Sequence, residues 1–242
     1  MPICDASQIG ELGTILAVWA HPDDETFCAG GILATAILAG QTVVCVTATR
    51  GEAGVQDEQR WPADTLGAVR TRELKQALDV LGITKHHYLG YLDGLCAKAD
   101  KEGAITKLSS IIARYTPATI LTFGPDGLTG HPDHKAVSGW VSGAVAQQTE
   151  RPAVYHAVVT VDQYRDYLST AHQRLNLFYN IDQPPLELDE ACDICFRCTN
   201  ELCNCKFNAF LAMPSQFETM HKTLGEEFLK EAFRVEAFVR AY

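Results

Sequence analysis

Short apolar runs alternate with helix-length segments over the first 160 residues of the chain. Residues 14–20 form a continuous apolar run, which is typical of a strand buried on both faces of a parallel sheet. Parallel strands must be joined by crossovers, so this alternation predicts an α/β, Rossmann-like, mostly parallel sheet with helices on both faces. The expected strands are 14–20, 42–49, 86–89, 119–123 and 154–161, and the expected helices are 26–39, 66–81, 104–115 and 134–146.

The length and composition favour a single globular domain over residues 1–242. With 30 acidic and 20 basic residues the net charge is -10, and no cluster of Lys or Arg offers a surface for nucleic acid. The first apolar run is too short for a signal sequence or a membrane span. We therefore expect a cytoplasmic protein with no membrane span, acting on a small molecule.

The region after Ser215 has helical periodicity. One stripe of this predicted helix would contain Phe228, Ala232, Val235 and Val239. Such a stripe normally packs against the core, but it also suits a contact between two copies of the chain. The sequence thus leaves a homo-oligomer open.

Two polar segments directly follow predicted strands, where open parallel sheets bind their ligands. The first carries His21 and Asp24, and the second carries His131 and His134, each pair three residues apart. At a strand-to-helix turn this spacing lets both side chains of a pair converge on one ion. Two imidazoles and a carboxylate suit a catalytic zinc ion, which keeps a fourth position open for water. Spacing alone does not choose between His131 and His134 as the ligand.

These segments, Ala20-His-Pro-Asp-Asp-Glu25 and His131-Pro-Asp-His134, resemble the paired motifs of the PIG-L / LmbE-like zinc-dependent de-N-acetylases. The resemblance covers roughly residues 12–160 and implies removal of an N-acetyl or related N-acyl group from an amino-sugar conjugate. It also implies that His21, Asp24 and His134 hold one catalytic zinc ion. Asp23 would then be the general base, and His131 would face the substrate oxygen.

The same resemblance implies that Arg70 and Asp93 contact polar groups of the substrate, although a salt bridge or a turn cap would explain either residue. The loops over residues 51–64 and 162–193 would shape the substrate site. One departure from the family lies near the C-terminus, where many members have His-x-Ser-Gln and this chain has Met213-Pro-Ser-Gln216.

Five cysteines crowd into residues 190–206, which we interpret as a Cys-rich insert. Their close spacing resembles that of thiolate metal sites, so a second, structural zinc ion is one interpretation. An iron-sulfur cluster and uncoordinated or oxidised thiols are the others. The five are Cys192, Cys195, Cys198, Cys203 and Cys205.

Two other functions remain open on the sequence. A metal-dependent phosphoesterase also uses Asp and His at strand ends, but it needs two metal ions and more carboxylate ligands. A non-enzymatic module that binds a sugar or a protein partner would not need a base such as Asp23 beside the metal. The metal content and the release of acetate distinguish these readings.

Overall fold

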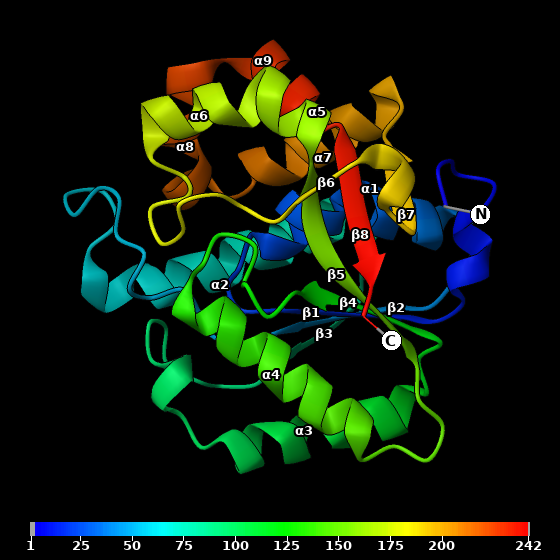
Figure 1. Ribbon diagram of the computed structural model, residues 1–242. Coiled ribbons are helices and arrows are strands. Elements are labelled where there is room, and N and C mark those ends of the chain that lie inside the picture. Colours follow the sequence, from blue (N-terminus) through cyan, green and yellow to red (C-terminus); the bar gives the residue numbers. More distant parts are fainter. Residues whose placement is uncertain (1–2, 242) are drawn as a thin grey trace.

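One eight-stranded sheet forms the centre of the molecule in the computed structural model, which describes residues 3–241 (Figure 1). The strand order is β3-β2-β1-β4-β5-β8-β7, with β6 paired to β5, and the first five strands are parallel. β8 runs antiparallel to both β5 and β7. The strands are β1 (Ile15–Trp19), β2 (Val43–Thr47), β3 (Lys85–Tyr88), β4 (Thr119–Phe123), β5 (Ala153–Thr160), β6 (Leu186–Glu187), β7 (Ile194–Arg197) and β8 (Val235–Arg240).

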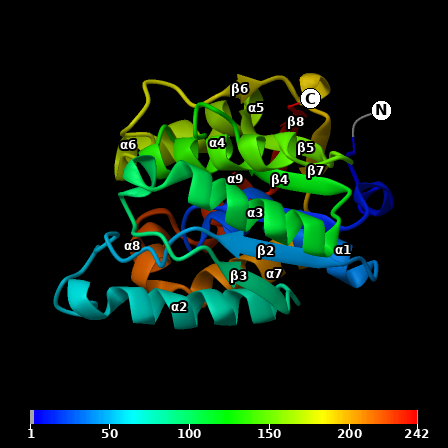
Figure 2. The ribbon, with the colours of Figure 1, turned by 90° about the horizontal axis from the view of Figure 1, so that it is seen from below.

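Helices cover both faces of this sheet. α3 and α4 lie on one face, and α1, α2 and α7 lie on the other (Figures 1 and 2). The α-helices are α1 (Asp24–Leu38), α2 (Ala63–Val80), α3 (Lys101–Tyr115), α4 (Pro132–Ala146), α5 (Val161–Gln163), α6 (Ser169–Leu175), α7 (Asn200–Leu211), α8 (Pro214–Leu224) and α9 (Glu226–Ala232). Short 3-10 turns are η1 (Ile9–Leu12), η2 (Cys96–Lys98) and η4 (Asp189–Ala191), and η3 (Tyr164–Leu168) is a π-helical turn. The predicted fold class is confirmed.

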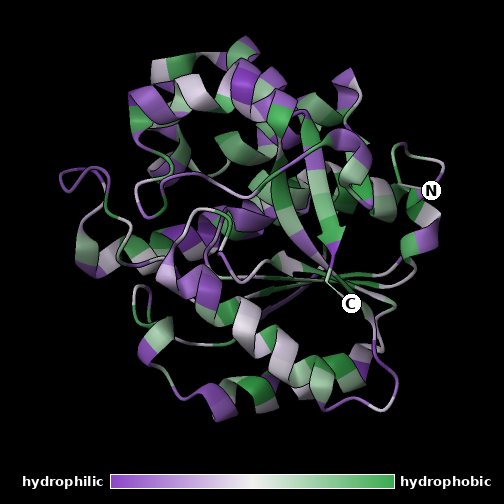
Figure 3. Cartoon of the chain, in the orientation of Figure 1, coloured by the Kyte–Doolittle hydropathy of each residue, from purple (hydrophilic) through white to green (hydrophobic). Residues whose placement is uncertain are grey.

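The central strands are apolar because both of their faces are covered. All five residues of β1, β2 and β4 are buried, and much of β5 and β8 is hydrophobic in Figure 3. Ile15 of β1 pairs with Val43 on one side and Thr119 on the other, so β1 and β4 are neighbours although more than a hundred residues separate them. The chain order reverses between these two strands, and ligands of open α/β sheets bind at this point.

The predicted C-terminal helix is wrong beyond Ala232. The helical region is interrupted at Gly225, whose φ of 82° ends α8, and α9 then stops at Ala232. Val235 and Val239 belong to β8, where the backbone pairs with β5 and β7. Their spacing from Phe228 matched a helix, but the two β-branched residues fit the strand that extends the sheet.

The segment after β5 also differs from the expected loop over residues 162–193. α5, η3 and α6 form one nearly continuous helical stretch there, followed by the short strand β6. Thr160 caps the start of this stretch, because its hydroxyl accepts a hydrogen bond from the amide of Gln163. Only part of the region is therefore irregular.

A buried ion pair joins the C-terminal part of the chain to α1. Lys206 of α7 and Glu236 of β8 lie 2.6 Å apart with side chains 3% and 0% exposed. The Glu236 carboxylate also accepts hydrogen bonds from the amides of Gly31 and Ile32 in the middle of α1. Lys206 donates to the carbonyl of Phe27. The pair thus fixes α1, and with it the helix start at Asp24, against α7 and β8.

We expect Lys206→Met to lower the free energy of unfolding by about 3–5 kcal/mol, because it leaves Glu236 buried without its cation. Urea unfolding of the purified protein measures this change. Lys222→Met is the matched control, since Lys222 makes an exposed pair with Glu218 and should cost less than about 1 kcal/mol. A cost for Lys206→Met as small as that of the control would contradict this account.

No helix within residues 3–241 is both long enough and apolar enough to cross a membrane.

Candidate metal centre

The turn between β1 and α1 presents three polar side chains at the carboxyl end of the sheet. His21 lies in this turn, Asp23 is the N-cap of α1, and Asp24 is the first residue of the helix. Asp24 accepts a hydrogen bond of 2.8 Å from the amide of His21, which closes the turn. A carboxylate at this position is also stabilised by the positive end of the helix.

The loop between β4 and α4 supplies two histidines to the same place. His131 is the N-cap of α4, and His134 lies in its first turn. Upstream, Gly130 has a φ of 76° and packs so closely on the 176–182 segment that a Cβ atom would lie 2.6 Å from the carbonyl of Asn180. This close packing holds the loop in place, and the loop in turn fixes the direction of both histidine side chains.

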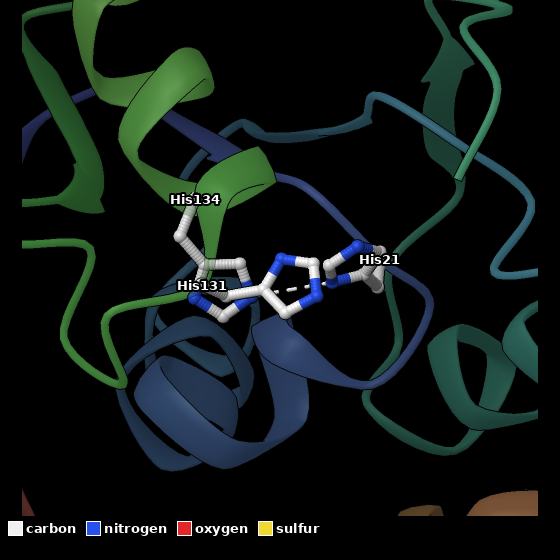
Figure 4. A group of neighbouring side chains, drawn as sticks. All are labelled: His21, His131 and His134. Carbon is white, nitrogen blue, oxygen red and sulfur yellow. Dashed lines mark hydrogen bonds between the residues drawn. The ribbon is translucent and has the colours of Figure 1, made fainter. Parts of the chain in front are cut away.

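His21, Asp24 and His134 form a small cage of ligand atoms (Figure 4 shows the histidines). His21 Nδ1 lies 3.2 Å from His134 Nε2 and 3.6 Å from Asp24 Oδ2, and His134 Nε2 lies 3.5 Å from Asp24 Oδ1. Tetrahedral zinc with ligand bonds of 2.0–2.1 Å separates its ligands by roughly 3.3 Å. The geometry of the cage therefore fits a zinc ion. His131 lies beside it, with its ring centroid 4.8 Å from that of His21.

The protonation of His134 suits a metal ligand. Its Nδ1 lies 2.9 Å from the carbonyl of Gly127, to which it donates, so the Nε2 lone pair faces the cage. Burial lowers the pKa of His134 to about 4, which keeps the ring neutral at physiological pH. The sequence contained no sign of this contact.

Two carboxylates orient His21 from its other side. His21 Nε2 lies 3.0 Å from Asp93 Oδ1 and 3.3 Å from Asp133 Oδ2. Burial opposes protonation of His21, but these hydrogen bonds outweigh it and raise the pKa to about 10. Backbone amides of Ala53, Gly94 and Cys96 hold the two carboxylates in turn. Hydrogen bonds of this kind fix the orientation of metal-binding histidines.

Asp133 was given no role in the sequence analysis, although it stands between the two histidines of the second motif. Its side chain is completely buried, and it accepts hydrogen bonds from the amides of Gly94 and Cys96. Asp93 was expected to contact the substrate, and the structure shows it bonded to His21 and to the amide of Ala53. Both residues thus connect the cage to the loop after β3.

Asp23 has a strained backbone and a buried cationic partner. Its φ of 121° is rare for a residue other than glycine and costs of order 1–3 kcal/mol. Arg70 lies 3.1 Å from Asp23 Oδ2 and donates to the carbonyls of Pro22 and Gly51. Burial raises the pKa of Asp23, and the Arg70 guanidinium opposes this rise. Arg70, which we expected to contact the substrate, therefore holds Asp23 and its turn.

His131 offers a hydrogen-bond donor to the space above the cage. Its Nδ1 accepts a hydrogen bond from the amide of Asp133, so the proton of the neutral ring lies on Nε2. Burial lowers the pKa of His131, which favours this neutral form. Two other sets of side chains are also close enough together to hold one ion. The first is His21, His131 and His134, and the second is His21, Asp93 and Asp133.

The cysteine cluster gives no support for a second metal site. Within the described chain, no three of its thiols come close enough together to hold one ion. Cys195 lies in β7, Cys203 and Cys205 lie in α7, and Cys192 and Cys198 lie just before and just after β7. Cys192 lies against the carbonyl of Leu188, Cys205 against that of Val80, and Cys203 against that of Cys198. The fold therefore does not gather these cysteines around one ion.

A family model described as PIG-L, GlcNAc-PI de-N-acetylase, matches residues 16–145, which is more than half of the chain and contains the whole cage. The chain belongs to the PIG-L family. A 1D-myo-inositol 2-acetamido-2-deoxy-alpha-D-glucopyranoside deacetylase from Mycobacterium sp. (strain JLS) is 33% identical in an alignment of 179 residues that covers 65% of this chain. The match spans 58% of that relative, so this PIG-L chain covers little more than half of its length.

Solved structures share the fold over nearly the whole chain. The N,N'-diacetylchitobiose deacetylase of Pyrococcus horikoshii is 20% identical with a TM-score of 0.67, covering 97% of this chain and 85% of that one. The 4-carboxy-2-hydroxymuconate hydratase of Pseudomonas putida is 17% identical with a TM-score of 0.61, covering 95% and 96%. Because a deacetylase and a hydratase share this fold, the chemistry must be argued from the PIG-L site residues themselves.

Proposed function

We propose that this chain hydrolyses the N-acetyl, or a related N-acyl, amide of an amino-sugar conjugate with one zinc ion held by His21, Asp24 and His134. The observation that carries the proposal is a base, Asp23, directly beside a three-ligand cage with zinc spacing. Relatives named as deacetylases of N-acetylglucosamine conjugates support the substrate class.

The choice of ligands rests on which atoms are still available. Asp93 and Asp133 already accept hydrogen bonds from His21 and from backbone amides, which suits an outer shell. His131 uses its Nδ1 to accept from the amide of Asp133 and keeps a donor on Nε2. Asp24 supplies a negative charge, which the other two ligands, both histidines, cannot supply.

The residues around the cage have separate roles in the proposed amide hydrolysis. A zinc ion in the cage would supply a Lewis acid that polarises the carbonyl and lowers the pKa of water. Asp23 accepts the proton of the attacking water as the new C–O bond forms, and its side chain is 17% exposed and within reach of solvent. The His131 Nε2 hydrogen donates to the developing oxyanion. Asp23 then returns the proton to the leaving nitrogen, and the products are a carboxylate and a free amine.

Release of acetate tests the proposal. Zinc-loaded protein is incubated with N-acetylglucosaminyl inositol, N,N'-diacetylchitobiose and N-acetylglucosamine, and with p-nitrophenyl phosphate for the rival phosphoesterase. We expect acetate from at least one amino sugar, lost on chelation, and no phosphate. Release of phosphate alone, with two metal ions per chain, would establish the rival. Bound metal without release of either product would favour the non-enzymatic binding module.

Arg70 gives a prediction that separates positioning of the base from binding of the substrate. We expect Arg70→Met to keep stoichiometric zinc and to lower kcat by about 10–100-fold, because it releases Asp23 from its position. KM should change much less. Steady-state kinetics with zinc analysis measures both, and a rise in KM at unchanged kcat would instead assign Arg70 to substrate binding. Arg114→Met is the matched control, since Arg114 is exposed in the last turn of α3, just before β4 begins and at the other end of that strand from the cage.

The partners and location follow as part of the same proposal. The acidic net charge of -10 fits a small conjugate and not a nucleic acid. We infer a cytoplasmic protein, and size-exclusion chromatography with light scattering measures whether it forms a homo-oligomer.

A further inference from the structure

An apolar cavity of about 190 Å³ lies beside the cage, on the side of β5 and β8. Its walls come from α1, the loop before α4, β5, η3, the segment after α6, α8 and β8. Its apolar lining includes Phe27, Leu168, Phe178, Met220 and Phe233. The proposed deacetylation of an N-acetyl group does not need a cavity of this size.

Two residues connect the cavity to the proposed metal ligands. Thr129 lines the cavity, and its hydroxyl lies 3.3 Å from Nδ1 of His134. Cys28 also lines it and follows Asp24 by four residues on α1, so both lie on the same face of the helix. The cavity wall therefore includes one residue in contact with His134 and one residue a helical turn from Asp24.

The polar groups in the cavity wall are already used by the protein. The Glu236 carboxylate accepts from Lys206 and from the amides of Gly31 and Ile32. The Gln163 amide donates to the carbonyls of Ala232 and Val235. These groups would gain little from a ligand, so the cavity favours a part of the substrate that is purely hydrocarbon.

The opposite side of the cage is polar. The loop of residues 51–57 lies there, with its polar and partly exposed Glu52, Gln56 and Asp57, over the ends of β2 and β3. The scissile amide also has two unlike sides, since a polyhydroxylated sugar carries the nitrogen and the acyl group carries only carbon and hydrogen beyond its carbonyl. With the amide at the metal, the sugar matches the polar side, and the acyl group matches the cavity.

We infer that this cavity binds the alkyl chain of an N-acyl amino sugar and that the preferred acyl group is a chain of about six carbons, since an apolar cavity of about 150 Å³ holds benzene. The inference rests on the proposed amide hydrolysis and specifies its substrate. Water adds to the acyl carbon, the C–N bond breaks, and the proton taken up by Asp23 goes to the leaving nitrogen. The products are a medium-chain carboxylate and the free amino sugar.

A series of N-acyl glucosamines tests the inference, with acetyl, butanoyl, hexanoyl and decanoyl groups and detection of the free amine. We expect kcat/KM to rise about fourfold for each added CH₂ up to about six carbons, because each methylene leaves water for the cavity. It should then fall for decanoyl. A maximum at acetyl overturns the inference but leaves the proposed function intact. Loss of all four activities in zinc-loaded protein overturns both.

Substitutions that fill the cavity provide a second test. It compares kcat/KM for two substrates of the same variant, so a partial loss of folded protein cancels in the ratio. Met220→Trp should lower the ratio of hexanoyl to acetyl kcat/KM more than tenfold, and Val159→Phe should do the same from β5. Leu211→Trp is the matched control, since Leu211 is exposed on α7 and lies outside the cavity. An unchanged ratio in both filled variants contradicts the inference. Inhibition by hexanoate stronger than by acetate, lost in the filled variants, supports it without turnover.

Discussion

Asp23→Asn should keep one zinc ion per chain and lower kcat by about 10²–10⁴-fold, which is the usual contribution of a positioned general base. The amide that replaces the carboxylate has the same shape, so Arg70 can still hold it, but it cannot accept a proton from water. Asp23 is the N-cap of α1 and lies outside the cage, so the metal site should remain. Zinc analysis and steady-state kinetics on the same preparation measure the two effects.

The control for this variant is Asp79→Asn, an isosteric change at an exposed position in the last turn of α2. It should leave both zinc content and kcat as in the unmodified protein. Full activity of Asp23→Asn would show that another group accepts the proton. Loss of zinc in Asp23→Asn would instead move this residue into the cage.

Asp24→Ala should lose stoichiometric zinc and, with it, all metal-dependent turnover. The substitution removes the only carboxylate of the proposed ligand set and leaves two histidines, which is too few for a stable zinc site. His131→Ala is the informative contrast, because it should keep zinc and lower kcat by about 10²–10³-fold through the lost oxyanion contact. Atomic absorption after dialysis, together with kinetics, measures both variants.

The contrary outcome is equally specific. If His131→Ala bound no zinc while His134→Ala still bound it, His131 would be the zinc ligand and His134 would not. Zinc retained in Asp24→Ala would point to the neighbouring set of His21, Asp93 and Asp133, whose ligand atoms are also close together.

The sequence predicted the parallel part of the sheet because burial on both faces leaves a pattern that is local. A strand such as β1 needs an uninterrupted apolar run, and its crossover helix needs a helical length of chain. The placement of the two motifs at strand ends followed from the same pattern. β8 was mistaken for helix because the spacing of its valines suited both structures, and only its pairing with β5 and β7 decides.

The sequence did not predict the contacts around the cage. Asp93 and Asp133 meet His21 only after β1, β3 and β4 are placed in the sheet, since the three residues come from separate loops. Arg70 reaches Asp23 across the gap between α2 and the turn before α1. No spacing rule predicts such contacts, because they depend on the tertiary arrangement. The cysteine cluster shows the converse, since closeness in sequence did not bring three of its thiols within reach of one ion.

The cavity and the cage come from different parts of the chain. Its lining comes from β5, η3, α8 and β8, which lie largely outside residues 16–145. The cage and the proposed base thus come from the region that the family model matches. The selectivity proposed for the acyl chain comes mostly from the remainder of the chain.

X-ray absorption at the zinc edge tests the central claim most directly, because it reports the atoms that bind the ion. The account predicts one zinc ion per chain with only nitrogen and oxygen neighbours at about 2.0–2.1 Å, including two imidazoles. His134→Ala should abolish this signal. Sulfur neighbours at about 2.3 Å would place the ion at the cysteines, and carefully reconstituted protein that binds no zinc would contradict the account altogether.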